Sequence, residues 1–442
     1  MELVTRAIKG TKDVLPSESY KNQYIESTAM GVADCFGYGE IRTPVFEHTE
    51  LFNRSVGDTT DVVQKEMYTF DDKGGRSITL RPEGTAGAVR SFLENGLFNE
   101  PLPQKMSYLT SCYRYEKPQS GRYREFHQFG VECIGAADAA ADAEIISLAV
   151  QVFDMLGVEN LSLEINSIGC PECRKKYTAA LREYFEGHKG ELCETCLSRL
   201  ERNPMRILDC KSPVCSEISA GAPVVLDYIC DDCRAHFESL KGFLEALEID
   251  YTVNPQIVRG LDYYTRTVFE IISNNKDTQG LVCCGGGRYD GLVGELGGPS
   301  LPACGFGMGL ERVRLIMETA DVPFPEKTRT DLFLASMGEK ANVLAAKIVS
   351  DLRFDGVRAD FELCGRSVKA QMKFAGKTGA HYTAVIGDGE IESGEIVLKN
   401  MDDSSTQTVP LEGFQEEFSN ILIQGVLSDM NQANAEDFDI KL

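Results

Sequence analysis

The fold is decided by the stretch YRYEKPQSGRYREFHQ, residues 113–128. Residues 105–116 and 124–135 have strand character, and the polar segment 117–121 between them, with its Pro and Gly, has the composition of a turn. This pattern predicts two antiparallel strands joined as a hairpin. An antiparallel sheet is therefore expected in this part of the chain.

Charged and aromatic side chains share the faces of this hairpin. Because successive strand residues point to opposite sides of a sheet, Arg114 and Glu116 lie on one face of the first strand. On the second strand, Phe126, Gln128 and Glu132 share a face. A guanidinium fork suits a phosphate and a ring face suits a base. The set as a whole favours a nucleotide site, although a single arginine would favour a solvated surface hairpin.

A second informative stretch is RGLDYYT, residues 259–265, in a region of strand character. Neighbouring strand residues face opposite sides of a sheet, so one of Tyr263 and Tyr264 is expected to pack in the core. Further along, three consecutive glycines at 285–287 indicate either a tight turn or backbone that approaches a ligand closely.

Composition limits the class of protein. The chain has 442 residues, enough for two or three domains, and a formal net charge of −23. This charge argues against broad nucleic-acid binding, but a local basic patch remains effective because salt screens charges beyond roughly 8 Å. The sequence contains no signal-like N-terminus and no apolar run of about 18 residues. A cytoplasmic protein without membrane contact is therefore expected.

Cysteines are numerous, and the eight between residues 170 and 233 form four pairs. In a reducing compartment such pairs indicate metal ligation before disulfides. The first two pairs are separated by a spacing typical of zinc ribbons, and the last two form a second set. The predicted ligands of structural Zn²⁺ are Cys170, Cys173, Cys193, Cys196, Cys210, Cys215, Cys230 and Cys233. Unligated thiols are the alternative, and the sequence does not decide which pairs combine.

The order of motifs resembles that of the class II aminoacyl-tRNA synthetases. Residues 39–44 (GEIRTP) are similar to motif 1, residues 113–128 to motif 2, and residues 305–312 (GFGMGLER) to motif 3. Two further stretches, 259–264 (RGLDYY) and 286–292 (GGRYDGL), resemble the histidine-specific motifs of the histidyl-tRNA synthetase family. The resemblance covers residues 1–410.

This resemblance implies an α+β fold with a class II antiparallel-sheet catalytic domain and a C-terminal α/β anticodon-binding domain. The expected boundaries are 1–325 for the catalytic domain, with the cysteine-paired insertion at 170–250, and 326–425 for the anticodon-binding domain. Residues 426–442 are expected to form an acidic tail, and the chain after Gly413 to fray. Motif 1 implies a homodimer, and the chemistry implies ATP, Mg²⁺, L-histidine and histidine tRNA as cofactors and partners.

Residue roles follow from the resemblance. ATP would be held by Arg114, Glu116, Arg122, Phe126, Arg259 and Arg312. Among these, Arg114 and Arg259 would be the catalytic pair that holds the α-phosphate from two sides, and Phe126 would stack on adenine. Histidine would be bound by Glu83, Gln128, Glu132, Tyr264 and Tyr289. Glu83 would take the α-ammonium group, while Glu132 and Tyr264 would bind the two imidazole nitrogens.

The tRNA contacts are expected at two places. Residues 363–387 contain no Asp or Glu, which is unusual in so acidic a chain, and they carry Arg366, Lys369 and Lys373. A solvated helix face is the alternative, and Gly376 is expected to end this helix. The resemblance favours a contact with the anticodon stem here, and a second contact through Gln119 in the motif 2 loop.

Two other functions are weighed. A non-catalytic, synthetase-like regulatory subunit of histidine biosynthesis would share the fold, but such proteins typically lack the anticodon domain and lose the ATP arginines. A synthetase of the same subclass for another amino acid is disfavoured by residues 259–264 and 286–289.

Overall fold

The computed structural model describes residues 4–57, 60, 62–258 and 261–437. The chain divides into two compact units, Met1–Pro325 and Glu326–Leu442. Each unit has its own sheet and its own buried core.

The first unit is built on an eight-stranded sheet. In sheet order its strands are β1 (Gly39–Glu40), β5 (Gln104–Tyr113), β6 (Glu125–Ile134), β11 (Ala303–Gly309), β10 (Leu281–Arg288), β9 (Thr265–Ser273), β7 (Leu161–Ser167) and β8 (Thr252–Val253). All neighbours are antiparallel except β1 with β5 and β7 with β8. The predicted hairpin is confirmed, because β5 pairs with β6 from Gln104 opposite Ile134 to Tyr113 opposite Glu125.

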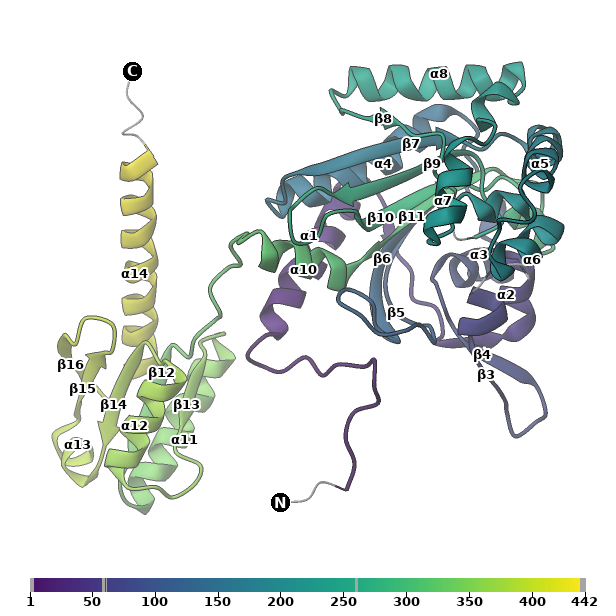
Figure 1. Ribbon diagram of the computed structural model, residues 1–442. Coiled ribbons are helices and arrows are strands. Elements are labelled where there is room, and N and C mark those ends of the chain that lie inside the picture. Colours follow the sequence, from purple (N-terminus) through teal and green to yellow (C-terminus); the bar gives the residue numbers. More distant parts are fainter. Residues whose placement is uncertain (1–3, 58–59, 61, 259–260, 438–442) are drawn as a thin grey trace. The chain divides into compact units, whose positions relative to one another are not determined.

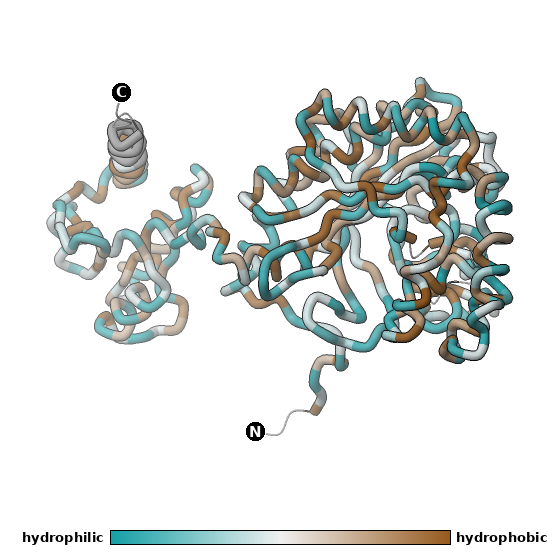
Figure 2. Tube along the Cα trace, turned by 45° about the horizontal axis from the view of Figure 1, so that its top comes forward, coloured by the Kyte–Doolittle hydropathy of each residue, from teal (hydrophilic) through white to brown (hydrophobic). Residues whose placement is uncertain are grey.

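Four helices cover one face of this sheet (Figure 1): α1 (Ser19–Cys35), α4 (Ala139–Met155), α8 (Asp231–Ala246) and α10 (Leu310–Thr319). Alternate residues of β6, namely Phe129, Val131 and Cys133, point into the core beneath them. On β11, Phe306 and Met308 do the same. Figure 2 shows hydrophobic stretches, coloured brown, along the central strands of this unit. The opposite face of β6 and β11 is therefore left for polar residues and glycines.

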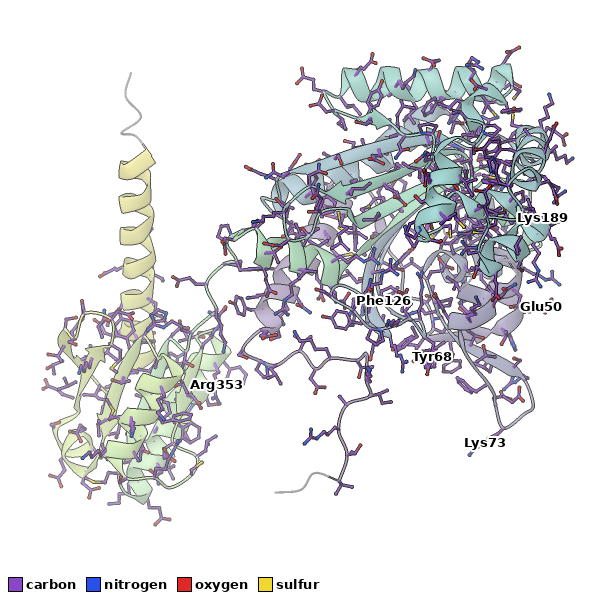
Figure 3. The ribbon with its side chains drawn as sticks, viewed as in Figure 1. Glu50, Tyr68, Lys73, Phe126, Lys189 and Arg353 are labelled. Carbon is purple, nitrogen blue, oxygen red and sulfur yellow. The ribbon has the colours of Figure 1, made fainter. Side chains whose placement is uncertain are left out.

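A smaller sheet and two helices stand beside this second face. The sheet has the order β2 (Phe46–His48), β4 (Ser77–Leu80), β3 (Tyr68–Asp71), and the helices are α2 (Thr49–Val56) and α3 (Thr85–Glu94). Lys73 lies at the tip of the β3–β4 hairpin, which projects from the unit (Figure 3). Short elements complete the region: the π-helix η1 (Val62–Glu66), the 3₁₀ turn η2 (Leu97–Asn99) and α9 (Leu292–Glu295).

Between β7 and β8 the chain forms a helical insertion. Its elements before α8 are α5 (Pro171–Glu186), α6 (Glu194–Arg202), η3 (Pro204–Ile207), α7 (Pro213–Ala220) and η4 (Val225–Asp227). Tyr177, Leu181 and Phe185 of α5 pack with Leu200 and Ile207 in a core of the insertion's own. The eight paired cysteines all belong to this part of the chain.

The second unit is a five-stranded mixed sheet with helices. Its strands, in sheet order, are β13 (Ala359–Phe361), β12 (Leu332–Ser336), β14 (Tyr382–Ile386), β15 (Glu395–Asn400) and β16 (Thr406–Pro410). Its helices are α11 (Glu339–Phe354), α12 (Val368–Thr378), α13 (Asp388–Ser393) and α14 (Phe414–Asp437). The strands β13, β12 and β14 are parallel, as expected for the α/β pattern.

Several expectations about local structure were wrong. The chain after Gly413 forms helix α14, because Phe414 and Phe418 pack into the core and two acidic residues favour the positive end of the helix. Helix α12 continues past Gly376 and ends at Gly379, which takes the left-handed conformation. Strand β5 ends at Tyr113, so Arg114 and Glu116 stand just beyond it. Among the described residues, no helix combines the length and apolar character required to cross a membrane.

Candidate active site

A cavity of about 570 Å³ opens on the polar face of the large sheet. Eight of the residues predicted from the sequence line it: Glu83, Arg114, Glu116, Arg122, Phe126, Gln128, Tyr264 and Arg312. They come from the loop before α3, from the β5–β6 hairpin, from the segment before β9 and from the start of α10. The alternation of β6 explains Phe126 and Gln128, which face away from the helical core. Gly307 and Gly309 of β11 line the cavity as well.

Three arginines and one carboxylate form the charged end of the cavity. Arg114 lies 3.8 Å and Arg122 3.5 Å from the Glu116 carboxylate. Arg312 is held by the backbone, donating to the carbonyl oxygens of Gly121 at 3.2 Å and Val282 at 2.6 Å. Burial and the neighbouring arginines lower the pKa of Arg312. The guanidinium groups of Arg114, Arg122 and Arg312 make this end of the cavity suited to a polyanion.

An aromatic ring adjoins this charged end. Phe126 is the second residue of strand β6 after the loop (Figure 3), and the Arg114 guanidinium lies 5.3 Å from its ring centre. Arg114 is oriented by a 2.8 Å hydrogen bond to the carbonyl oxygen of Pro82. A ring face beside fixed cations can bind a base and its phosphate together.

Glu83 supplies a buried carboxylate at the N-terminus of α3. Its oxygens accept hydrogen bonds from the backbone N–H groups of Thr85 at 2.6 Å and Ala86 at 2.9 Å. Burial raises the pKa of Glu83, while these two donors and Arg114 oppose the rise. An ammonium group placed beside Glu83 would further stabilise the charged carboxylate, so this position suits a primary amine.

Glu132 and Tyr289 both lie behind the cavity wall, and neither of them lines the cavity. The Glu132 carboxylate is fully buried and accepts hydrogen bonds from the hydroxyls of Tyr108, at 2.8 Å, and of Tyr289. Burial raises its pKa well above the ordinary glutamate range. Gly305 permits this arrangement, because a Cβ there would meet a Glu132 oxygen at 2.3 Å. Tyr108, which no sequence pattern indicated, lines the cavity and connects Glu132 to it.

Tyr263 and Tyr264 lie between the cavity and an apolar core. Both line the cavity, with ring centres 4.7 Å apart, and both are buried in a cluster with Val268 and Tyr289. One of the two was expected to pack in the core, and both do. Strand alternation does not separate them, because β9 begins at Thr265. Tyr289 contacts both rings from behind, at 5.3 Å and 6.3 Å.

The glycine triplet has mainly a structural role. Gly285 lines the cavity, but a Cβ on Gly286 would meet the carbonyl oxygen of Gly305 on the adjacent strand at 2.2 Å. Gly287 has a φ of +154°, and a Cβ there would meet the carbonyl oxygen of Thr267 at 2.3 Å. Close contact between strands therefore explains two of the three glycines, and the expected approach to a ligand concerns Gly285 alone.

Arg259 and Gly260 lie outside the described residues. The predicted pairing of Arg114 with Arg259 across one phosphate therefore stays a prediction. Two carboxylates that the sequence analysis did not single out, Glu270 on β9 and Glu311 on α10, also line the cavity. Alternation along β9 could have indicated Glu270, since it lies between the core residues Phe269 and Ile271.

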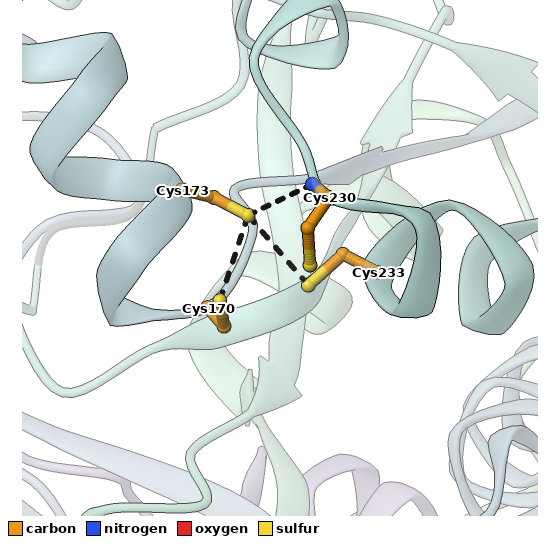
Figure 4. Close-up of side chains that lie close together, drawn as sticks. All are labelled: Cys170, Cys173, Cys230 and Cys233. Carbon is orange, nitrogen blue, oxygen red and sulfur yellow. Dashed lines mark hydrogen bonds between the residues drawn. The ribbon is translucent and has the colours of Figure 1, made fainter.

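The cysteine pairs combine in a different way from their order along the chain. The first and last pairs, at 170/173 and 230/233, form one cluster (Figure 4), and the two middle pairs, at 193/196 and 210/215, form the other. The sequence left the combination of pairs open, and the first two pairs, which have the spacing of a zinc ribbon, fall into different clusters. The chain leaves the sheet after β7 and returns through α8, so the ends of the insertion meet.

The residues predicted to contact tRNA occupy exposed positions with one exception. Gln119 is exposed in the hairpin loop, and Lys369 and Lys373 are exposed one turn apart on α12. Arg366 instead has internal partners, since it lies 2.9 Å from the Glu362 carboxylate and its guanidinium lies 4.0 Å from the ring centre of Phe374.

Comparisons with known proteins agree with this geometry. Residues 10–172 and 221–313 match the model of the family described as histidyl-tRNA synthetase. The chain belongs to the histidyl-tRNA synthetase family. Residues 331–421 match the model of an anticodon binding domain. The resemblance stated from the motifs is thereby confirmed.

The similarity extends over almost the whole chain. It is 56% identical to the histidine–tRNA ligase of Acetivibrio thermocellus, over 93% of this chain and 98% of the relative. It is 55% identical to that of Clostridium novyi, over 95% and 100%. The crystal structure of apo S. aureus histidyl-tRNA synthetase, 40% identical, superposes with a TM-score of 0.81 and covers 94% of this chain and 100% of that one. The predicted α+β class II fold with a C-terminal anticodon-binding domain is confirmed.

Proposed function

We propose that this chain is a histidine–tRNA ligase, which activates histidine with ATP and transfers it to the 3′ end of histidine tRNA. The observation that carries the proposal is a single cavity with three arginines and an aromatic ring at one end and buried tyrosines and carboxylates at the other. Its relatives at 56% and 55% identity carry the same name.

ATP binds at the charged end. Arg114 contacts the α-phosphate, Phe126 stacks on adenine and Glu116 lies at the adenine edge. Arg122 and Arg312 take the β- and γ-phosphates. The short distances between Glu116 and the two arginines support this arrangement, because the carboxylate keeps the cations together until the triphosphate replaces part of its interaction.

Histidine binds at the tyrosine end. Glu83 takes the α-ammonium group with the help of Gln128. Tyr264 contacts one imidazole nitrogen directly, and Glu132 acts through Tyr108 and Tyr289, whose hydroxyls it orients. An amino acid without a polar ring could not make these hydrogen bonds, and a site built to hydrogen-bond its substrate can discriminate against such a molecule by ~10⁴.

The reaction uses the substrate carboxylate as nucleophile. One histidine carboxylate oxygen attacks the α-phosphorus, the bond to the bridging oxygen breaks, and pyrophosphate leaves with the electron pair. The adenylate then gives its acyl group to a ribose hydroxyl of the terminal tRNA adenosine and releases AMP. No side-chain nucleophile is needed, so the enzyme contributes position and positive charge through Arg114 and, as the sequence proposes, Arg259.

Mg²⁺ fits the donor set of the cavity. The carboxylates of Glu116 and Glu270 line it beside the arginines, and hard oxygen ligands are those that Mg²⁺ prefers. These residues would hold the ion together with phosphate oxygens. When bound, Mg²⁺ neutralises charge on the triphosphate. The protein's own residues orient the triphosphate so that pyrophosphate can leave in line.

The tRNA would contact the exposed lysines of α12 and Gln119 in the hairpin loop. The active form would be a homodimer that uses the motif 1 region, where Val45, Phe46 and Phe70 are 40%, 57% and 48% exposed. The fifteen unbridged cysteines suit the reducing cytoplasm. Eight of them would bind structural Zn²⁺ in the insertion.

The alternatives are less well supported. A regulatory subunit would need none of the ATP arginines, whereas Arg114, Arg122 and Arg312 all line one cavity and an anticodon-domain match is present. A synthetase for another amino acid would not require the buried Glu132–Tyr289 pair.

Pyrophosphate exchange distinguishes these functions. Exchange of labelled pyrophosphate into ATP is expected with histidine and with none of the other standard amino acids. Charging of total tRNA with labelled histidine should follow. A regulatory subunit would give no exchange with any amino acid, and a different synthetase would give exchange with another one.

A further inference from the structure

Two clusters of four thiols lie in the insertion. All Sγ atoms within each cluster lie within 4.8 Å of one another. In the inner cluster, Cys173 Sγ lies 3.5 Å from that of Cys170 and 3.9 Å from that of Cys233 (Figure 4). In the outer cluster, the Sγ atoms of Cys193 and Cys210 lie 3.9 Å apart. Four sulfurs around a tetrahedral Zn²⁺ with bonds of about 2.3 Å are separated by roughly 3.8 Å.

Helix ends and backbone donors orient these thiols. Cys170, Cys193 and Cys230 each precede the first residue of a helix, so their sulfurs lie at the positive end of the helix dipole, which favours thiolates. The backbone N–H of Cys230 donates to Cys173 Sγ at 3.0 Å, and that of Cys193 donates to Cys215 Sγ at 3.3 Å. Such donors stabilise thiolate ligands. The second cysteine of each pair is buried, so the clusters are built into cores of the insertion.

The inner cluster joins the two ends of the insertion. Cys170 and Cys173 stand where the chain leaves β7, and Cys230 and Cys233 stand where α8 begins the return to the sheet. Arg174, directly after Cys173, donates to the backbone oxygen of Asp262 at 3.1 Å. This cluster therefore lies next to the segment that carries Tyr263 and Tyr264.

The outer cluster holds a segment that reaches the cavity. Between Cys196 and Cys210 the chain carries Asn203 and Arg206, whose side chains lie 3.2 Å and 3.4 Å from the Asp262 carboxylate. Cys210 itself stands between Asp209 and Lys211, which both line the cavity. A cysteine of the outer cluster is therefore directly bonded, through the backbone, to two residues of the cavity wall.

We propose that the insertion binds two structural Zn²⁺ ions, one in each cluster, and that the outer ion positions residues 203–211 as part of the histidine and ATP site. Each ion replaces four thiol protons, which pass to solvent, so no oxidant or reductant is required. The second half of the proposal rests on the proposed function, whereas the metal count does not. Asn203 and Arg206 act as positioning residues through Asp262 and the tyrosines that follow it.

Metal analysis of the full-length chain tests the first half. After exchange into metal-free buffer the wild type should retain about two Zn²⁺ per chain. Cys193→Ser with Cys210→Ser should leave about one, and so should Cys170→Ser with Cys230→Ser. The matched control, Cys35→Ser with Cys364→Ser, removes two exposed cysteines outside the clusters and should keep about two.

Two outcomes would overturn the metal sites. One is a wild type with less than about half an equivalent of Zn²⁺ that also gives no thiolate charge-transfer absorption with Co²⁺. The other is a loss of both ions in each double variant while the protein stays folded, which would mean one shared site. If a double variant does not fold, Co²⁺ titration of the refolded wild type decides whether there are two sites. Two successive equivalents of Co²⁺ should then bind, each with the spectrum of a tetrahedral thiolate site.

Hydrogen exchange tests the second half without relying on activity. Loss of the outer ion should speed amide exchange in residues 203–211 and 261–264 by at least about tenfold, with little change in α4. The same variant should raise KM for histidine more than it lowers kcat. Unchanged exchange in a variant that has lost the outer ion would overturn the positioning role. If two ions are bound but pyrophosphate exchange is absent, the proposed function fails and the metal sites stand.

Discussion

The guanidinium carbon of Arg114 lies 5.3 Å from the ring centre of Phe126, and both side chains line one cavity. In the proposed site, a nucleotide whose base stacks on this ring would bring its α-phosphate next to this guanidinium. The hairpin between β5 and β6 would then supply both base binding and charge stabilisation, from residues on either side of one short loop.

Loss of the Arg114 charge should reduce catalysis strongly. Arg114→Ala is expected to lower kcat/KM of pyrophosphate exchange by about 100-fold or more, which corresponds to ~3 kcal/mol of transition-state stabilisation. Arg114→Lys should recover only part of the lost kcat/KM, because an ammonium group lacks the guanidinium fork. Arg76→Ala, at a 66% exposed position on the β3–β4 hairpin, is the matched control. A kcat/KM within about twofold of wild type for Arg114→Ala would contradict this role.

Removal of the Phe126 ring should weaken ATP binding. Stacking of a base on an aromatic side chain contributes about 1–3 kcal/mol, so Phe126→Ala should raise KM for ATP by roughly 5- to 150-fold. Phe126→Tyr keeps the ring and should stay near wild type. Phe354→Ala, an exposed phenylalanine at the end of α11, controls for the loss of a ring elsewhere. Equal KM values for ATP in Phe126→Ala and Phe354→Ala would argue against stacking.

The buried Glu132 should give the stability of the protein a characteristic pH dependence. Its pKa is raised by burial, so the folded state binds this proton more tightly than the unfolded state. Its stabilising contribution is therefore present below the ordinary glutamate pKa of about 4.3 and is lost as pH rises through the folded value. Glu132→Gln removes this titration. The free energy of unfolding of wild type minus that of Glu132→Gln should thus fall as pH rises.

Urea unfolding of both proteins at several pH values measures this difference. Glu50→Gln, at an exposed position on α2 (Figure 3), is the control and should follow the wild type throughout. Glu132→Gln should also raise KM for histidine while leaving KM for ATP near wild type. A stability difference that is constant with pH would contradict the raised pKa.

The lysines of α12 should contribute to tRNA binding. Lys369→Ala and Lys373→Ala are each expected to raise KM for tRNA and to reduce the slope of log affinity against log salt by about 0.7–0.9. Lys347→Ala on α11, a 71% exposed lysine, is the control. Arg366→Ala should reduce stability instead, because Arg366 is bound to Glu362 and Phe374. An unchanged KM for tRNA in both lysine variants would rule out this contact.

Much of the fold was predictable because its signals are local. The β5–β6 hairpin follows from two alternating segments around a turn, and the face that carries Phe126 and Gln128 follows from strand periodicity. The cysteine clusters were recognisable as pairs, since cysteines a few residues apart near a helix start can bring their sulfurs together. Their combination depends on where the insertion begins and ends in space, which spacing alone does not contain.

Other details depend on where a strand ends or on which residue lies beside it. Strand alternation does not separate Tyr263 from Tyr264, because β9 begins one residue later. A direct contact of Glu132 with the substrate stays a prediction, and the sequence did not indicate that Tyr108 on the neighbouring strand would line the cavity and donate to Glu132. Which residues lie opposite one another on neighbouring strands depends on pairing between distant segments, and local sequence patterns do not determine it.

A crystal structure with a non-hydrolysable sulfamoyl analogue of histidyl-adenylate tests the central claim most directly. We expect adenine on the Phe126 ring, a sulfamoyl oxygen about 3 Å from the Arg114 guanidinium, and the imidazole against Tyr264. Arg259 should contact the sulfamoyl group from the opposite side. An analogue that binds elsewhere, or that places its sulfamoyl group away from Arg114, would contradict the proposed site.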